Sequence, residues 1–169
     1  MHNIRAISYG AICVSLMAVC SWISIPFAIP FTLQTFAVFF TTALMGTKRA
    51  LIALIAYLLL GACGMPVFSG FTGGISAFLG PAGGFITGFV PAVLISGIIM
   101  KNGGSVRMIS GMLAGLTSLY AMGSLWYMLA YDASFTAVMS VCILPFIPGD
   151  IAKILLAAYL GKRLKRVVC

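Results

Sequence analysis

The chain has 169 residues, of which 62% are hydrophobic and only 7% are charged. A soluble globular domain carries roughly 25% charged residues, so the composition excludes a water-soluble protein and predicts one polytopic membrane domain over residues 1–169. The formal net charge is +8, but the basic residues stand singly or in short clusters without interleaved aromatics, which favours cytoplasmic anchoring over nucleic-acid binding.

The positions of the basic residues predict the topology. All but Lys153 lie in four short clusters, and the breaks at 26–30, 64–81 and 131–134 carry no Lys or Arg. Because short positive loops stay on the cytoplasmic side, this alternation predicts an all-α integral membrane protein with six transmembrane helices and both termini cytoplasmic. The expected spans are 6–25, 31–45, 50–63, 82–100, 106–130 and 135–161.

Three of these spans have unusual lengths. The second and third are shorter than the usual 17 to 25 residues of a crossing helix. The sixth is overlong and contains Pro145 and Pro148, which remove backbone donors and predict a bend or break. A broken helix is tolerated in a membrane where it lines a cavity, so the sixth span is a candidate for a binding site.

The first span carries small residues along one face. Ser8, Ala11, Ser15 and Ala18 follow helical spacing and form a smooth stripe that suits contact with another helix. Periodicity alone leaves open whether that helix belongs to this chain or to a partner.

The longest break, 64–81, is an apolar and glycine-rich outer loop between the third and fourth helices. It holds no charge, five glycines, and the aromatic residues Phe68, Phe71 and Phe78. Because an exposed loop is normally more polar, we expect it to fold back onto the bundle with the three rings buried. It is then either a lid over an outward-facing pocket or a structural plug.

Glycines recur at four-residue spacing after this loop. Gly80, Gly84 and Gly88 predict a helix face that approaches another backbone or a ligand closely, and helix packing is the commoner reason. Gly111 and Gly115 repeat the pattern in the fifth span, where we expect packing alone.

The sixth span contains an ionisable pair, Asp150 and Lys153. A charge at the bilayer midplane costs roughly 2.5 to 3.5 kcal/mol on insertion scales, so the pair requires a purpose. It is either a structural ion pair or a binding site. Pro148 and Gly149 precede it and place Asp150 near a helix start, which favours binding of a small ligand with N–H groups at one end and a carboxylate elsewhere.

Other polar and aromatic residues are candidates to complete that site. The polar ones are Thr32, Gln34, Thr35 and Thr72, and the aromatic ones are Tyr120, Trp126 and Tyr127. Catalysis is not expected, because His2 is the only histidine and the H-E-x-x-H and G-x-S-x-G motifs are absent. No phosphate-binding G-x-x-x-x-G-K-[ST] loop is present either, so the chain is not predicted to hydrolyse ATP. No metal site is predicted.

Four ordered motifs resemble those of a known family. They are I-P-F-T-L-Q-T at 29–35, G-M-P-V-F-S-G-F at 64–71, L-G-P-A-G-G-F at 79–85, and L-P-F-I-P-G-D-I-A-K at 144–153. The sequence resembles the BioY family, the biotin-specific S components of energy-coupling factor (ECF) transporters. The resemblance covers nearly the whole chain.

The resemblance implies a six-helix protein of the prokaryotic plasma membrane that captures biotin from outside and needs no cofactor. It implies docking, through a first-helix face mapped onto Ala11, Ser15 and Ala18, to a transmembrane coupling subunit driven by two ATPases, with lipid as the surrounding solvent. Asp150 and Lys153 match the family's ligand-contacting P-G-D-x-x-K motif. The candidate substrate site is completed by Gly149, Gln34, Thr32, Phe71, Thr72, Gly84 and Tyr120.

The sequence departs from the family pattern in one motif, and the spacing of the charged pair restricts how a ligand can bind. Ala82 and Phe85 replace a threonine and a tyrosine of the family's G-P-T-G-G-Y motif, which removes two hydroxyls. Asp150 and Lys153 also lie about one turn, ~5 Å, apart, so they cannot hold both ends of an extended biotin without other groups. The alternative function is that of an S component for another small vitamin. A small intramembrane enzyme is a second and less favoured alternative.

Overall fold

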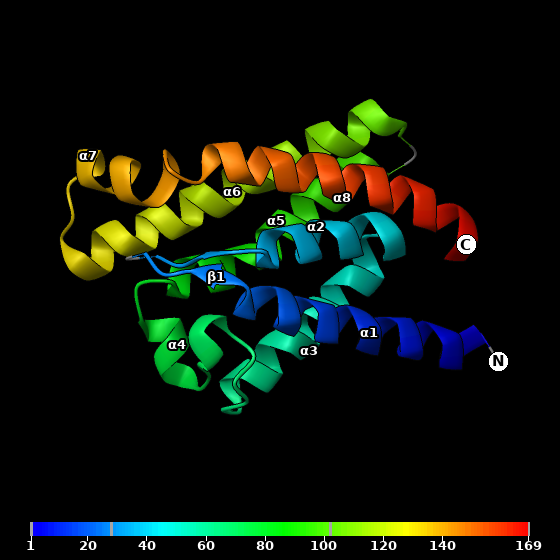
Figure 1. Ribbon diagram of the computed structural model, residues 1–169, viewed down its shortest axis with the longest axis horizontal. Coiled ribbons are helices and arrows are strands. Elements are labelled where there is room, and N and C mark those ends of the chain that lie inside the picture. Colours follow the sequence, from blue (N-terminus) through cyan, green and yellow to red (C-terminus); the bar gives the residue numbers. More distant parts are fainter. Residues whose placement is uncertain (1, 28, 102, 169) are drawn as a thin grey trace.

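The computed structural model describes residues 2–27, 29–101 and 103–168 and is a bundle of helices (Figure 1). The long helices are α1 (His2–Trp22), α2 (Gln34–Met45), α3 (Thr47–Ala62), α5 (Gly83–Met100), α6 (Ser105–Tyr131) and α8 (Ile147–Val168). The short elements are strands β1 (Ser24–Ile25) and β2 (Phe31–Thr32), the 3-10 turn η1 (Ser69–Phe71), α4 (Ile75–Leu79), α7 (Phe135–Val138) and the π-helical turn η2 (Met139–Ile143). The all-α prediction is confirmed.

The bundle has two distinct ends. The start of α1 and the end of α8 lie at one end, together with the α2–α3 and α5–α6 connections (Figure 1). The β1–β2 pair, α4 and the α6–α7 turn lie at the other. We call these the termini-bearing end and the loop-bearing end.

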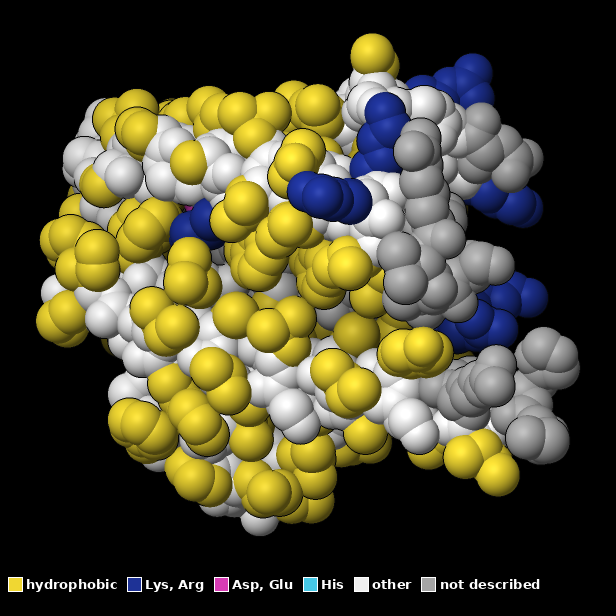
Figure 2. Space-filling model, turned by 45° about the vertical axis from the view of Figure 1, so that its right-hand side comes forward, with side chains coloured by type: hydrophobic (Ala, Val, Ile, Leu, Met, Phe, Trp, Pro, Cys, Tyr) yellow, Lys and Arg dark blue, Asp and Glu magenta, His cyan; other side chains and the backbone are white. Residues whose placement is uncertain are grey.

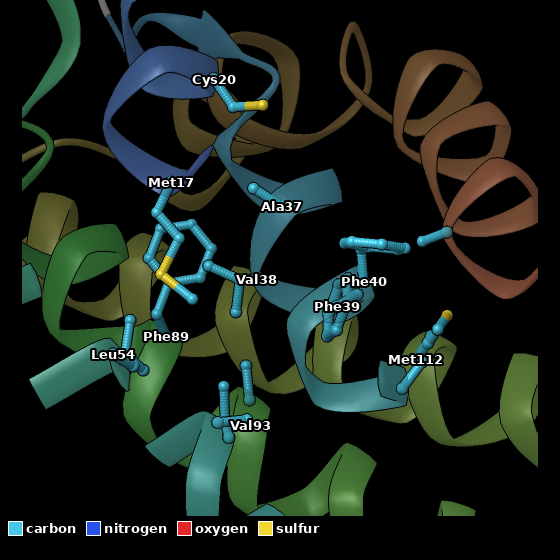
Figure 3. Close-up of a cluster of buried hydrophobic side chains, with 14 of the residues drawn as sticks. Met17, Cys20, Ala37, Val38, Phe39, Phe40, Leu54, Phe89, Val93 and Met112 are labelled. Atoms are coloured by element: carbon cyan, nitrogen blue, oxygen red, sulfur yellow. The ribbon is translucent and has the colours of Figure 1, made fainter. Parts of the chain in front are cut away.

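Helix α2 forms the centre of the bundle, because ten of its twelve residues are buried. Its side chains Val38 and Phe39 belong to one buried cluster with Met17 of α1, Leu54 of α3 and Phe89 of α5 (Figure 3). The helix begins later than the expected 31–45 span, because Phe31 and Thr32 pair with Ile25 and Ser24 as a short antiparallel ladder.

Glycines bring α5 and α6 together along the most extensive helix pair. A Cβ atom at Gly115 would stand 2.7 Å from the Ala92 carbonyl oxygen, and one at Gly111 would stand 2.8 Å from that of Ser96. Gly84 is packed against Trp126 in the same way. The predicted packing role is therefore confirmed for these glycines, whereas Gly80 ends α4 and lies outside α5.

The loop at 64–81 folds back on the bundle. Phe68 is buried and meets Phe78 edge-on, but Phe71 is 64% exposed, so its expected burial is wrong. Phe71 has a positive φ of 56°, which turns it outward to stack on Trp22 with ring centroids 5.0 Å apart. Phe71 therefore packs on the exposed ring of Trp22 and does not enter the hydrophobic core.

Hydrogen bonds fasten both ends of this loop. The Trp22 indole donates to the Pro66 carbonyl at 2.8 Å, and the Tyr57 hydroxyl donates to the Val67 carbonyl at 2.7 Å. At the other end, the Trp126 indole donates to the Gly80 carbonyl at 3.0 Å. These three hydrogen bonds hold the loop against the helices of the bundle.

The sixth predicted span is broken, as its prolines predict. The segments Phe135–Ile143 and Ile147–Leu164 meet at a bend of 46° around Pro145. Pro148 lies in the first turn of α8, where its missing N–H has no helical partner to lose. The break therefore places a fresh helix start just before Asp150.

The surface is that of a membrane protein. Hydrophobic side chains cover most of the visible face, and most visible Lys and Arg side chains gather toward the termini-bearing end (Figure 2). Within the described residues, α5 and α6 are long and apolar enough to cross a membrane, and the bent α7–α8 pair is a third candidate span. Segments Ile7–Trp22 and Gln34–Met45 are shorter apolar helices.

The small-residue stripe of α1 divides between solvent-facing and packed positions. Ser8, Ala11 and Ser15 are exposed, and the two serine hydroxyls bond back to their own helix. Ala18 is buried in the hydrophobic core, so its predicted place on an open docking face is wrong. The spacing of the small residues identifies one face of α1, but it does not tell which part of that face is buried by neighbouring helices.

Candidate functional site

A cavity of about 350 Å³ lies at the loop-bearing end, among β2, the starts of α2, α5 and α8, the middle of α6, and the 64–81 loop. Its size falls in the usual range for small-molecule sites. Its polar lining residues are Thr32, Gln34, Thr35, Ser69, Thr72, Ser76, Tyr120, Asp150 and Lys153. Its apolar lining includes Ile29, Phe31, Phe68, Ala82, Phe85, Ile86, Phe89, Leu119 and Phe146.

Asp150 and Lys153 form the charged end of this cavity. They are 4% and 6% exposed, and the Lys153 Nζ donates to Asp150 Oδ1 at 2.8 Å. Tyr120 donates its hydroxyl to the other carboxylate oxygen, Oδ2, at 2.6 Å. The Lys153 Nζ also donates to the Thr32 carbonyl at 2.6 Å and stands 3.4 Å from the centre of the Phe31 ring.

The local sequence explains how this group is built. Three-residue spacing places both ionisable side chains on one face of α8. Gly149 leaves room for the Phe31 ring, because a side chain at this position would overlap the ring. The ring is stacked on Phe146, 5.4 Å away, and is thereby held beside the lysine. Gly149 thus supports the site without lining the cavity.

The rest of the cavity is neutral. Gln34 is 5% exposed, and its Nε2 is a buried donor with no hydrogen-bond partner in the described part of the chain. Such a buried donor costs free energy unless a ligand or water accepts a hydrogen bond from it.

The mouth of the cavity is marked by Ser76 and Thr72, which are exposed and belong to the 64–81 loop.

Six of the nine predicted substrate-site residues line the cavity. They are Asp150, Lys153, Gln34, Thr32, Thr72 and Tyr120. Phe71 faces away onto Trp22, and Gly84 packs against Trp126, so neither lines it. Trp126 and Tyr127 are also outside the lining, whereas Thr35 is part of it.

Sequence reasoning missed most of the apolar walls. Phe31 of β2, Phe89 of α5 and Phe146 of the turn before α8 line the cavity. Nothing in a largely apolar sequence distinguishes such residues from ordinary core residues. Ala82 and Phe85, the two positions that depart from the family motif, also line the cavity. The cavity of this chain therefore lacks the two hydroxyls that threonine and tyrosine would place there.

The chain is similar to curated biotin transporters. It is 36% identical over 166 residues to the biotin transporter BioY of Thermotoga maritima, covering 96% of this chain and 97% of the relative. It is 36% identical over 162 residues to a probable biotin transporter BioY of Pyrococcus horikoshii, covering 95% and 96%.

A solved structure has the same fold. A crystal structure described as the S-component for biotin from an ECF-type ABC transporter matches with a TM-score of 0.90 and 25% sequence identity, over 98% of this chain and 93% of that one. The family model for the BioY family matches residues 1–169. The chain therefore belongs to the BioY family.

Proposed function

We propose that this chain captures biotin as the substrate-binding membrane subunit of an ECF-type transporter. The observation that carries the proposal is the cavity with the Asp150–Lys153 pair at its buried end. Membership of the BioY family and the named activity of the relatives support it. The chain acts as a binding and transport subunit, not as an enzyme, and biotin is its cargo.

The geometry supports one orientation for the ligand. The Lys153 Nζ and Asp150 Oδ1 are 2.8 Å apart, so both serve the same end of the ligand. A ureido ring has N–H groups that suit a carboxylate and a carbonyl that suits an ammonium. Among the described residues, Lys153 donates one hydrogen bond to Oδ1 of Asp150 and Tyr120 donates one to Oδ2, and each carboxylate oxygen can accept a second. The ureido ring therefore belongs at this end.

The valerate carboxylate then points toward the mouth. No second cation lines the cavity within the described residues, so the tail must rely on neutral donors and water. The hydroxyls of Ser69, Thr72 and Ser76 lie in the loop wall on that side, and the apolar rings flank the ring system and chain between the two ends. In this orientation, two residues one turn apart need to hold only one end of an extended ligand.

The proposed membrane arrangement follows the charge distribution. We assign six spans, with the termini-bearing end and its Lys and Arg cluster toward the cytoplasm of a prokaryotic cell and the cavity toward the outside. The exposed part of the α1 stripe, Ser8, Ala11 and Ser15, would contact the transmembrane coupling subunit of a module that contains two ATPases.

Calorimetric titration of the detergent-purified chain with biotin tests the proposal. We expect saturable binding that is lost in Asp150→Asn and in Lys153→Met. Asp132→Asn is the matched control, because Asp132 caps α6 outside the cavity lining. Binding of another vitamin in preference to biotin, or normal biotin binding by both site variants, would contradict the proposal.

A modified ligand tests the orientation. Biotin methyl ester keeps the ureido ring and a carbonyl acceptor but loses the carboxylate charge, and we expect it to bind less than about tenfold more weakly, because the ester carbonyl still accepts from the neutral hydroxyls at the mouth and a change of about 1 kcal/mol is roughly fivefold in affinity. Methylation of the ureido nitrogens should cost far more. The reverse order would place the carboxylate at Asp150 and Lys153.

A further inference from the structure

A second depression lies at the termini-bearing end, remote from the biotin cavity. It measures about 640 Å³ and opens between the α2–α3 connection and the α5–α6 connection. Its lining residues include Thr47, Lys48, Arg49, Ile98, Met100, Lys101 and Met108. We call it the basic groove.

The groove has more positive charge than the chain can neutralise. Lys48, Arg49 and Lys101 are exposed and line it, and the Arg107 side chain packs over Gly103 at its edge. The whole sequence contains only two acidic residues. One is bonded to Lys153 in the biotin cavity, and the other follows α6 at the loop-bearing end. Converging cations repel one another, so the groove favours an anion from outside the chain.

The groove also has an apolar side. Ile98 lines it and is 68% exposed, and Met100 and Met108 form part of its wall. One helical turn further along α5, on the same face, Leu94 is 38% exposed. The positive lining thus continues into an apolar strip that runs along the helix toward the middle of the bundle.

We propose that the basic groove binds the headgroup of an anionic phospholipid. Its phosphate lies among Lys48, Arg49 and Lys101, and an acyl chain follows Ile98 and Leu94. Basic pockets between transmembrane helices suit such headgroups. A free phosphate ion offers the same anionic chemistry, but it makes no use of the apolar strip. The proposal is independent of biotin binding, because none of the described residues lines both sites.

Native mass spectrometry of the detergent-purified chain tests it. The probes are dioleoylphosphatidylglycerol and, as the zwitterionic comparison, dioleoylphosphatidylcholine. We expect the wild type to bind one phosphatidylglycerol at least about tenfold more tightly than phosphatidylcholine. Each basic side chain contributes about fivefold near an anionic headgroup, so Lys48→Gln/Arg49→Gln/Lys101→Gln should lose on the order of 100-fold.

A control variant tests whether the lipid binds to the groove itself or responds to the general positive charge of the termini-bearing end. The variant Lys162→Gln/Arg163→Gln removes two exposed charges from α8, and no described residue of α8 lines the groove. We expect it to bind phosphatidylglycerol within about threefold of wild type. Equal losses in the two variants, or equal binding of the two lipids by the wild type, would overturn the proposal.

Competition distinguishes the lipid from a free anion. A large excess of inorganic phosphate should leave the bound phosphatidylglycerol in place, and its displacement by phosphate would overturn the assignment to a lipid. Circular dichroism melting in lipid-free detergent provides the folding control. Because the three replaced side chains are exposed, we expect the wild-type melting temperature, which assigns the lost binding to the groove.

Discussion

Removing one or both members of the Asp150–Lys153 pair separates a structural role from a ligand-binding role. At 2.8 Å, two unit charges attract with about 6 kcal/mol at an effective dielectric constant of about 20. Lys153→Met removes this attraction and leaves the carboxylate of Asp150, which is 4% exposed, with the Tyr120 hydroxyl as its one side-chain donor among the described residues. Breaking a buried pair in this way costs about 3–5 kcal/mol, so we expect Lys153→Met to destabilise the fold by that amount.

The double variant Asp150→Asn/Lys153→Met should recover most of that loss. It removes both charges, and replacing a buried ion pair by neutral residues of similar size is often nearly neutral for stability. Biotin binding should not recover, because each lost charge-assisted hydrogen bond is worth about 1.5–3 kcal/mol and two of them amount to more than about 100-fold in affinity.

Both quantities can be measured on the same preparations. Unfolding by sodium dodecyl sulfate in mild detergent gives the free energy of unfolding, and calorimetric titration gives biotin affinity. A double variant that binds biotin within threefold of wild type would refute the ligand-binding role and leave the pair purely structural. A Lys153→Met variant as stable as wild type would refute the cost assigned to an unpaired carboxylate at this position.

Two pairs of substitutions test the fold, and one further substitution tests the docking face. Gly115→Leu should lower the free energy of unfolding by about 1–3 kcal/mol or more, because the added side chain overpacks the α5–α6 contact. Gly10→Ala places its methyl group in open space and should leave the free energy of unfolding nearly unchanged, so equal effects of the two substitutions would contradict the close α5–α6 packing. Phe68→Ala should cost about 3–5 kcal/mol and Phe71→Ala under about 1 kcal/mol in the same unfolding assay, and the reverse order would contradict the loop structure. Ser15→Trp should abolish biotin uptake by the assembled transporter while leaving biotin affinity within about twofold, and normal uptake would remove α1 from the docking face.

The sequence located the charged end of the site because charge is conspicuous in this composition. Asp150 and Lys153 stand out in an apolar segment, and the adjacent prolines predicted the helix start that presents them. Phe31 could not be found in this way. Its role depends on contact with Gly149 and on its position over Lys153, more than a hundred residues away in the chain.

The wrong predictions share a physical cause. Periodicity defines a helix face without specifying what covers it, and the docking face that the resemblance implies includes Ala18 although the core covers this residue. Composition likewise predicted that Phe71 would be buried, but its backbone turn directs it to an exposed aromatic partner. Both errors concern tertiary neighbours, which a single sequence does not specify.

The distribution of charge gives the two ends of the molecule different requirements for a ligand. At the loop-bearing end, Lys153 neutralises Asp150, so the cavity carries no net charge from this pair and needs no counter-ion when it is empty. A neutral ureido ring then adds hydrogen bonds there without adding charge. At the termini-bearing end, Lys48, Arg49 and Lys101 have no carboxylate partner within the described chain, and an anion lowers their mutual repulsion. Charge selection therefore favours a neutral ligand group at one end and an anionic headgroup at the other.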